Sequence, residues 1–422
     1  MTMRGGQILH LGGDVVLIDR LQSAGLGDIN IGTDTIRETG NYLNVEKILQ
    51  DPDLSFSMES FDVSTEVEAL LTGDASGGAT AAASAEYKFS DMGSVHIVSP
   101  WKNESAGSAG TVDSGVVIPN YFTTRASYRF GVDENAGETF ELAGSETYMA
   151  LFNPVNETFL CDGIASAFVT GASAVKHRVG GYQSSELKYV LGVIVDSDVK
   201  VEGSNADFVA TTAGTSDAEV VTVTFTTPPD SGSVVHLAYF DATQPPSAAF
   251  DQSIHPAATT KPGAVRGRDI KVFAHVPSGG SSPSGTVELK CIQSVTVEGT
   301  KTTELERCMG ELLPIGRTVT QQDVTGDLVI HPDGGPALHT FLRQITGVAS
   351  GESIGVLNDF PVGLEVRILN PKDRGEVLKT IFVEDAKFQI PATPARAGAI
   401  VDFTLRWESN QGEFSVFNGE MP

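Results

Sequence analysis

Short runs in which apolar and polar residues alternate recur along the whole sequence. The run VHIVSPWK begins at Val95, the run VRILNPK begins at Val366, and each reaches a proline near its end. A period of two residues is typical of a strand with one buried face, and proline tends to end such a strand. The 45 glycines and 20 prolines supply turns between the runs. The pattern predicts a mainly β protein built from many short strands.

One segment combines a short strand with a short helix. In Leu54–Gly73 (LSFSMESFDVSTEVEALLTG), Thr65 and Glu68 have the spacing of a helix capping box. Gly73 stands where a left-handed helix stop is expected. The apolar face of this helix is predicted to consist of Val67, Leu70 and Leu71.

A second segment of equal length, Leu328–Gly347 (LVIHPDGGPALHTFLRQITG), repeats this design. Pro336 suits the first turn of a helix, and Gly347 is the expected stop. The repetition predicts that two parts of the chain share one fold. The apolar face of the second helix is predicted to consist of Leu338, Phe341, Leu342 and Ile345.

Flanking motifs occur in the same order around both segments. We therefore predict two copies of a β-sandwich or barrel domain, each with one short helix; chance similarity between β-rich stretches is the alternative. The corresponding motifs are Gln22-Ser23 with Gln293-Ser294, Ile36-Arg37 with Glu306-Arg307, the Val95 run with the Val366 run, ASYRF from Ala126 with AKFQI from Ala386, and TFEL from Thr139 with DFTL from Asp402.

A different segment lies between the copies. It contains two alternating runs around the turn Pro-Pro-Asp-Ser-Gly, which predicts a β-hairpin. A stretch rich in Pro, Ala and Thr, Gln244–Gly263, is predicted to be a linker. The predicted domains are residues 1–154 (first copy), 155–262 (an inserted β-sandwich-like module and linker) and 263–422 (second copy). The alternating residues of the hairpin are Val221, Val223 and Phe225, then Val235, Leu237 and Tyr239.

Composition narrows the classes of function. The net charge of −26 argues against tight nucleic-acid binding, which needs cationic contacts to phosphate. This acidic net charge is compatible with a surface past which DNA slides without binding. It is equally compatible with a role that only keeps the protein soluble. Cys161, Cys291 and Cys308 match no zinc motif, so we expect buried free thiols. The sequence opens on no signal peptide and has no apolar run of about 18 residues. We therefore expect a soluble protein made in the cytoplasm.

No candidate motif for catalysis or ligand binding has the residue spacing that its chemistry requires. Gly73–Gly78 lacks the spacing of a serine-protease nucleophile, the eight histidines lack zinc-helix spacing, and no phosphate-binding loop occurs. We predict no catalytic, cofactor-binding or metal-ligating residue, and no enzymatic activity. Arg266–Asp269 is predicted to be a solvated turn or a basic contact to a neighbouring subunit. Asp133-Glu134 and the pair Asp196 and Asp198 are predicted to be solvated turns, and Asn103 and Asn156 are predicted to be unmodified.

The opening stretch, LIDRLQSAGLGDINIGTDTIRETGNYLNVEKILQDPDLSFSMESFDVSTEVEALLTG from Leu17, resembles the start of major tail tube proteins of long-tailed (siphovirus-type) bacteriophages. The resemblance covers the two outer thirds of the chain and lies in the order of elements. It implies two packed sheets and one helix per domain, with sheets of neighbouring subunits joined edge to edge into rings. Stacked rings form a tube in the virion tail, through which DNA passes without specific binding. The implied partners are other copies, the tape measure protein, and tail terminator or baseplate proteins.

The duplication sets the expected ring size. In that family six tube domains surround the lumen, so a chain with two such domains is expected to form trimeric rings. One tube domain assembled from both ends of the chain would instead give a hexamer. The alternatives for function are another β-rich virion protein, such as a head decoration protein or tail terminator, and a carbohydrate-binding surface protein or glycosidase. We also expect an outward-pointing insertion and a mainly acidic lumen.

Overall fold

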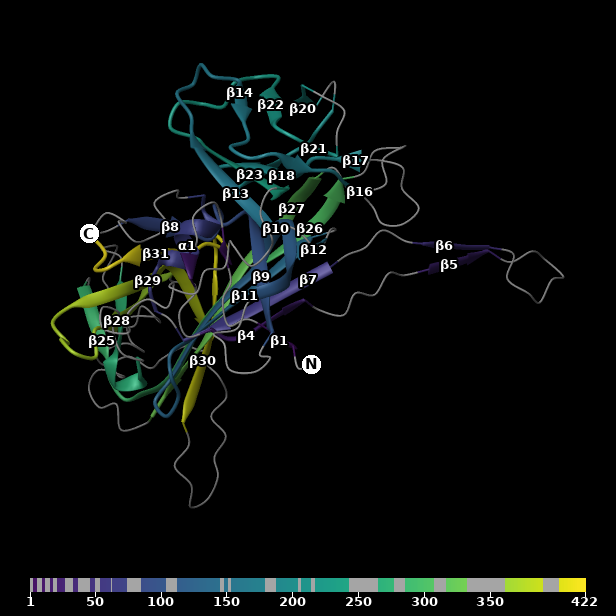
Figure 1. The fold of residues 1–422 in the computed structure, drawn as a ribbon. Helices are drawn as coiled ribbons and strands as arrows, with labels where there is room; N and C mark the ends of the chain where they lie inside the picture. The colour runs from purple at the N-terminus through teal and green to yellow at the C-terminus, as the bar shows by residue number, and fades with distance from the viewer. Residues whose placement is uncertain are drawn as a thin grey trace, which may run out of the picture.

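The computed structural model describes residues 54–61, 63–73, 85–103, 112–144, 148–150, 153–178, 187–203, 206–213, 217–242, 265–276, 285–306, 316–331, 361–389 and 402–422, and six short strands before residue 50. The protein is mainly β, as the alternating pattern predicts. Figure 1 shows a body of long strands with a smaller group of strands above it. The linker Gln244–Gly263, the second predicted helix, Asp74–Gly78 and Cys308 lie outside the described residues.

The first half of the chain forms an antiparallel sheet, and β12 (Tyr148–Ala150) also pairs with β10. In spatial order its strands are β3 (Val16–Leu17), β2 (His10–Leu11), β9 (Ser94–Asn103), β10 (Val112–Gly131), β11 (Gly137–Gly144), β7 (Leu54–Ser60) and β4 (Leu21–Leu26). Three further elements are β1 (Met3–Gly5), which pairs with β9, and the hairpin β5 (Thr33–Ile36) and β6 (Glu46–Leu49), which stands away from the body in Figure 1.

The second half builds a sheet with the same strand order, and β31 (Ser415–Asn418) also pairs with β29. In spatial order its strands are β25 (Gly285–Leu289), β24 (Ile270–Val276), β28 (Val362–Leu369), β29 (Val377–Gln389), β30 (Phe403–Ser409), β27 (Gly316–Ile330) and β26 (Ile292–Glu306). Each strand thus has a counterpart in the first half at the same place in the sheet, β12 and β31 included.

Three β-bulges recur at corresponding places in the halves. Gln22 is the extra residue of β4 opposite β7, and Gln293 is the extra residue of β26 opposite β27. Two further extra residues lie in β10 opposite β9, and two lie at the corresponding places in β29 opposite β28. Bulges fix the register of a strand pair, so the two halves share register as well as order.

The corresponding strands are those that the sequence comparison paired. Its match of Gln22-Ser23 with Gln293-Ser294 is in register, because both pairs begin at a bulge, whereas the offsets of its longer segments are wrong. Counted from the bulges, Leu328 corresponds to Met58 instead of Leu54, and Val95 corresponds to Val362 instead of Val366. Side chains of a strand alternate with a period of two, so two strands shifted by an even number of residues still align apolar with apolar positions. The sequence comparison cannot detect such a shift.

The predicted first helix is α1 (Glu66–Leu71), and its predicted apolar face is buried. Gly73 follows it with a φ of +81°, the left-handed stop that glycine provides. The predicted capping box is wrong, because Thr65 makes no side-chain cap hydrogen bond. Glu68 points instead into a buried cluster of charges described below.

The residues from 153 to 241 form two facing sheets over one core, a sandwich-like arrangement. The larger sheet contains β13 (Asn153–Leu160), β15 (Ala174–Val175), β18 (Val190–Val195), β19 (Asp198–Lys200), β21 (Ala218–Glu219) and β23 (Val234–Asp241). The smaller contains β14 (Ala167–Val169), β20 (Phe208–Thr212) and β22 (Val221–Phe225), and a hairpin joins β16 (His177–Arg178) to β17 (Leu187–Lys188).

The predicted hairpin between β22 and β23 is wrong. In the described residues β22 pairs with β14 and β20, whereas β23 pairs with β13, β15 and β18. The buried faces of both strands, including Val223 and Leu237, meet in the shared core between the sheets. Alternation identified the buried residues correctly, but two strands facing across a sandwich alternate in the same way as two strands of a hairpin.

The insertion rests on the first half through a small apolar contact. Val117 on β10 packs with Leu191, Ala238 and Phe240 of the insertion, all buried. The turn after β18 also touches the body, since the backbone N–H of Ser94 donates to the carbonyl of Ser197 at 2.8 Å. Removing the insertion would therefore uncover part of the body.

Candidate assembly interface

The polar motifs set aside from the sequence form no reactive site in the described residues. Glu134 pairs with Arg129 at 3.3 Å on the surface, and Asp196 lies in a tight turn where it accepts a hydrogen bond from the N–H of Val234 at 2.9 Å. Asp269 is a correction: it is buried, and it accepts from Arg374 at 3.1 Å. Arg266–Asp269 is therefore an anchored turn instead of a solvated one.

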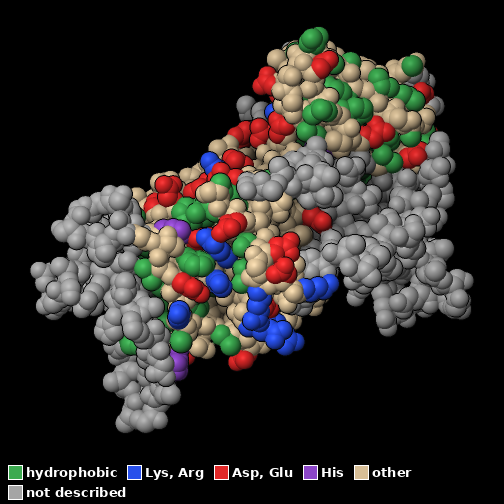
Figure 2. All heavy atoms as spheres, turned by 90° about the vertical axis from the view of Figure 1, so that its left-hand side faces the viewer, with side chains coloured by type: hydrophobic (Ala, Val, Ile, Leu, Met, Phe, Trp, Pro, Cys, Tyr) green, Lys and Arg blue, Asp and Glu red, His purple; other side chains and the backbone are tan. Residues whose placement is uncertain are grey.

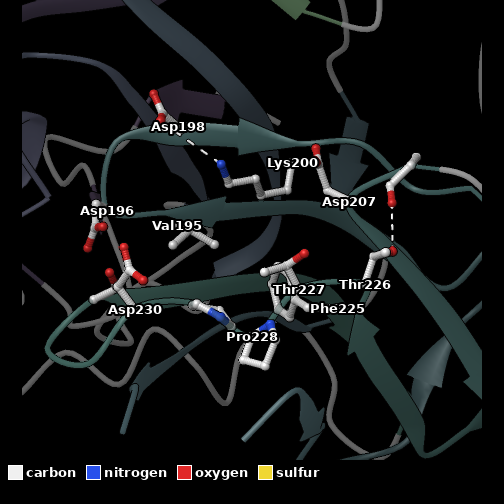
Figure 3. Close-up of a pocket in the computed structure, with 13 residues that line it drawn as sticks. Val195, Asp196, Asp198, Lys200, Asp207, Phe225, Thr226, Thr227, Pro228 and Asp230 are labelled. Atoms are coloured by element: carbon white, nitrogen blue, oxygen red, sulfur yellow. Dashed lines mark hydrogen bonds and ion pairs between the residues drawn. The ribbon is translucent and has the colours of Figure 1, made fainter. Parts of the chain in front are cut away.

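An open pocket of about 610 Å³ lies in the insertion. Figure 3 shows Asp196, Asp198, Asp207 and Asp230 around it, with Lys200 directed toward Asp198. Two of these carboxylates hold backbone N–H groups, and Asp198 lies 4.0 Å from Lys200. In the described part of the chain no His, Cys, Asp or Glu cluster could hold a metal ion. The pocket is an acidic surface hollow whose side chains serve the local fold.

The cysteines divide between burial and exposure. Cys161 is a buried free thiol, as predicted, and burial raises its pKa, with smaller contributions from Asp196 and Asp162. Cys291 is exposed, so the prediction that the thiols are buried is wrong there. Its φ of +58° places it in the turn between β25 and β26, where the side chain faces solvent.

The two corresponding halves meet edge to edge within one chain. Seven residues of β10, Arg125–Gly131, pair antiparallel with Ser294–Thr300 of β26. Because β26 is the counterpart of β4 and not of β10, the two edges that meet are different parts of the repeated sheet. A contact between unlike edges of like units is heterologous, the kind that extends into a ring or filament.

A second strand pair strengthens the same junction. β8 (Glu86–Lys88), from the first half, pairs with β31 of the second half. Beside it, the backbone N–H of Ser90 donates to Glu413 at 3.1 Å. Two separate edges of the second half, β26 and β31, are thus covered by the first half.

Buried charges join the halves at the centre of the junction. Lys379 on β29 donates to Glu138 of β11 at 2.7 Å and forms an ion pair with Glu68 of α1. Tyr128 of β10 donates to Glu68 at 2.8 Å, and all four side chains are almost fully buried. Lys379 of the second half is therefore held by a buried polar cluster of the first half.

The protonation states of this cluster follow from its geometry. Burial lowers the pKa of Lys379, but Glu138 and Glu68 outweigh it, so the pKa is raised above the ordinary 10.5. Burial, helped by the same carboxylates, raises the pKa of Tyr128 well above 10.0. Both groups therefore keep their protons at neutral pH.

A second cation crosses the junction close by. Lys301 of β26 donates to the carbonyls of Met92 at 2.6 Å and Ser90 at 3.1 Å, and it lies 4.8 Å from the ring centre of Phe89. Phe89 in turn stacks on Phe414 of the second half, with ring centroids 5.0 Å apart. Burial lowers the pKa of Lys301 to about 8, although Glu413 and Asp91 act in the opposite direction.

The sequence carries a signal for Lys379 that lies outside any known motif. It lies in the strand LKTIFV, where Lys379, Ile381 and Val383 occupy every second position and all point into the core. A lysine on the inward face of an alternating strand predicts a buried charge, which needs an acidic partner. Because Glu68 has the spacing of a helix-capping residue, the sequence does not point to it as that acidic partner.

Acidic and basic side chains are unevenly distributed over the surface. Figure 2 shows acidic side chains over the insertion and the upper body, with basic side chains gathered toward the lower end of the body on that face.

None of the helices in the described part of the chain has the length and apolar character needed to cross a membrane. No protein-family model matches the chain, and no curated protein is significantly similar to it.

Proposed function

We propose that this protein is the structural subunit of a phage tail tube, with no enzymatic role. The observation that carries the proposal is the junction of β10 with β26, where two units with the same strand order join through unlike edges. Applied repeatedly, such a contact gives a closed ring when the rotation closes. Exposed strand edges are otherwise a liability that soluble proteins hide.

The ring proposed here contains three chains, which supply six tube units around a pseudo-sixfold axis. Rings stack, and the β5–β6 hairpin, which stands away from the body, is the segment we assign to contacts between rings. DNA passes through the lumen during ejection without specific binding. The other proposed partners are the tape measure protein, the tail terminator and the baseplate, and the proposed location is the virion tail, after synthesis in the bacterial cytoplasm.

Electron microscopy of the purified protein tests the class of function. A tube subunit is expected to polymerise into hollow cylinders of constant diameter as its concentration rises. A head decoration protein would remain a small oligomer, and a tail terminator would stop at single rings. A glycan-array signal without polymerisation would favour a carbohydrate-binding protein instead.

A further inference from the structure

We propose that the joint between the insertion and the body is an acid-sensitive hinge, in which protonation of His96 releases the insertion from the body. The proposal goes beyond the tube function and does not depend on it. Its basis is the arrangement around one buried imidazole. The joint consists of His96, Val117 and Asn120 of the body and of Leu191, Gly192, His236, Ala238 and Phe240 of the insertion.

The insertion and the body each have a core of their own, so the joint can open while both stay folded. Strand β23 is buried on both faces, because one face points into the core of the insertion and the other faces the body. The apolar contact across the joint is small beside the two cores. The residues of the two faces of β23 are Val235, Leu237 and Tyr239, and His236, Ala238 and Phe240, respectively.

The backbone of the insertion closes directly over His96. This side chain lies on β9 and is 1% exposed, and β18 of the insertion contacts both β9 and β10 at the upper end of the body (Figure 1). Gly192 of β18 has to be glycine, because a side-chain carbon there would overlap the ring of His96 and the amide of Asn120. Water therefore reaches the imidazole only when the joint opens.

The hydrogen bonds of the closed joint require a neutral His96. The backbone N–H of Asn120 donates to Nδ1 at 3.3 Å, and a ring nitrogen that accepts a hydrogen bond carries no proton. The single ring proton is therefore on Nε2. Among the described residues, neither this Nε2 nor the Oδ1 of Asn120 has a hydrogen-bond partner. A second proton, on Nδ1, would face the N–H of Asn120, so the imidazolium does not fit the closed joint.

The charged groups around the joint do not favour the imidazolium either. The carboxylate of Asp196, at the end of β18, accepts from the N–H of Val234 at 2.9 Å, and Thr158 of β13 lies 3.3 Å from the Nδ1 of His236. Among the described residues, no carboxylate acts on His96. Burial, followed by the like charge of His236, lowers the pKa of His96 from 6.5 to about 3. The backbone of His236 opposes this shift without forming a full hydrogen bond.

Opening the joint returns His96 to water, where the pKa of an imidazole is about 6.5. Below pH 6.5 the open joint therefore binds a proton that the closed joint does not bind until about pH 3. Within this window the ratio of open to closed joints rises as the pH falls, by up to about tenfold per pH unit. Above pH 6.5 the imidazole is neutral in both states and does not oppose closure.

Labelling of a thiol placed in the joint tests the hinge. Ala238→Cys puts a small thiol on the face of β23 that the body covers. Isolated chains are treated with dithiodipyridine between about pH 7 and about pH 5, above the isoelectric point of about 4.6, and mass spectrometry gives the rate at each cysteine. The exposed Cys291 corrects for the pH dependence of the reaction, and Cys161, in the core of the insertion, reports unfolding of the insertion.

We expect the labelling rate at position 238, relative to Cys291, to rise by about tenfold or more over this range, because the joint opens. The matched variant combines Ala238→Cys with His96→Gln, whose amide oxygen can still accept from Asn120 and takes up no proton. In that variant the same ratio should change by less than about threefold. Labelling of Cys161 should stay slow in both proteins.

A ratio that stays flat with His96 present, or that rises equally in both proteins, would overturn the proposal. Acceleration at Cys161 in step with position 238 would also overturn it, because the insertion would then unfold instead of swinging away. Amide exchange of the unsubstituted chain, corrected for its intrinsic pH dependence, gives a second measurement. Ser94, whose N–H bonds across the joint, should lose protection in acid while Val223 keeps it. A Ser94 amide that stays protected would contradict the hinge.

Discussion

Lys379 and Glu138 lie in different halves of the chain, yet the Nζ of one is 2.7 Å from the Oε1 of the other in a site closed to solvent. The contact ties β29 to β11, two strands from different copies of the repeated sheet. A buried ion pair is weak evidence for extra stability, because desolvation offsets its Coulomb energy. It favours one fixed arrangement of the two halves, because losing Lys379 would leave two buried carboxylates without a cation.

Replacing Lys379 alone should be severely destabilising. Lys379→Met leaves Glu68 and Glu138 buried without a cation, and breaking a buried pair in this way costs about 3–5 kcal/mol. The free energy of unfolding, measured by denaturant titration of isolated chains, should fall by that amount. The matched control is Lys387→Met on the same strand, which is partly exposed and should change stability by less than about 0.5 kcal/mol.

A triple variant separates charge from packing. Combining Lys379→Met with Glu68→Gln and Glu138→Gln removes every charge of the cluster together, so it should recover more than half of the stability lost in Lys379→Met. A triple variant that is less stable than the single variant would show that the loss comes from packing, and the assigned role of the ion cluster would then be wrong.

Stability should depend on His96 in acid. Burial, with a smaller effect from His236, lowers the pKa of His96 from 6.5 to about 3. The unfolded chain therefore binds a proton near pH 6.5 that the folded chain accepts only near pH 3. Between these values stability must decrease as the pH falls, by up to about 1.4 kcal/mol per pH unit.

The variant His96→Gln isolates this contribution, because its amide oxygen can still accept the hydrogen bond from the N–H of Asn120. Its stability should decline less steeply than that of the parent between pH 6.5 and pH 3, whatever its stability at neutral pH. Parallel profiles for the parent and His96→Gln would contradict the assignment.

The helix packs its apolar face on the sheet, so a charge there should not be tolerated. Leu71 is fully buried, and Leu71→Asp should cost about 3–5 kcal/mol because the carboxylate gains no partner. Ser55→Asp places the same charge on the exposed face of β7 and should be close to neutral. A Leu71→Asp protein as stable as Ser55→Asp in thermal unfolding would disprove the packing.

The insertion should be dispensable for assembly but not for full stability. Residues 155–260 carry four basic and twelve acidic residues, which suits a solvated decoration on the outside of a tube. Replacing them by a short Gly/Ser bridge uncovers Val117, so the body should lose about 1–2 kcal/mol of stability. Cylinders of the deletion variant should still form, and density for the insertion inside the lumen of the parent would contradict its outward placement.

The lumen is expected to be lined mainly by acidic side chains. DNA carries one negative charge per about 1.7 Å of its axis, so a cationic wall would hold it, whereas an acidic wall lets it slide. The net charge of −26 motivates the prediction without locating the charges. A reconstruction of the assembled tube whose lumen is lined mainly by Lys and Arg would contradict it.

Local sequence patterns predicted the strands and their buried faces better than they predicted which strands pair with each other. Val221, Val223 and Phe225 were correctly assigned to a buried strand face because alternation is a property of the strand itself. Their pairing was assigned wrongly, because the choice between a hairpin and two facing sheets depends on contacts outside the segment. The offsets of the longer segments failed for a related reason: the register is set by the bulges, where Gln22-Ser23 and Gln293-Ser294 do correspond, and alternation alone does not carry that register into the neighbouring strands.

The interface was the hardest part to predict. Glu68 has the spacing of a capping residue, and only the approach of Lys379, 311 positions away along the chain, gives it a different role. Cys291 precedes the apolar Ile292, yet its side chain is exposed, in a turn where its φ is +58°. Each case depends on tertiary contacts or on a backbone angle that residue type alone does not determine.

The mass of a single ring tests the central claim most directly. Rings released from assembled tubes by mild denaturant can be weighed intact by native mass spectrometry. The account predicts three chains of 44.5 kDa per ring, with six tube units contributed by three duplicated chains. Six chains per ring would mean that both ends of each chain build a single tube unit, and the correspondence between the two halves would then have no role in assembly.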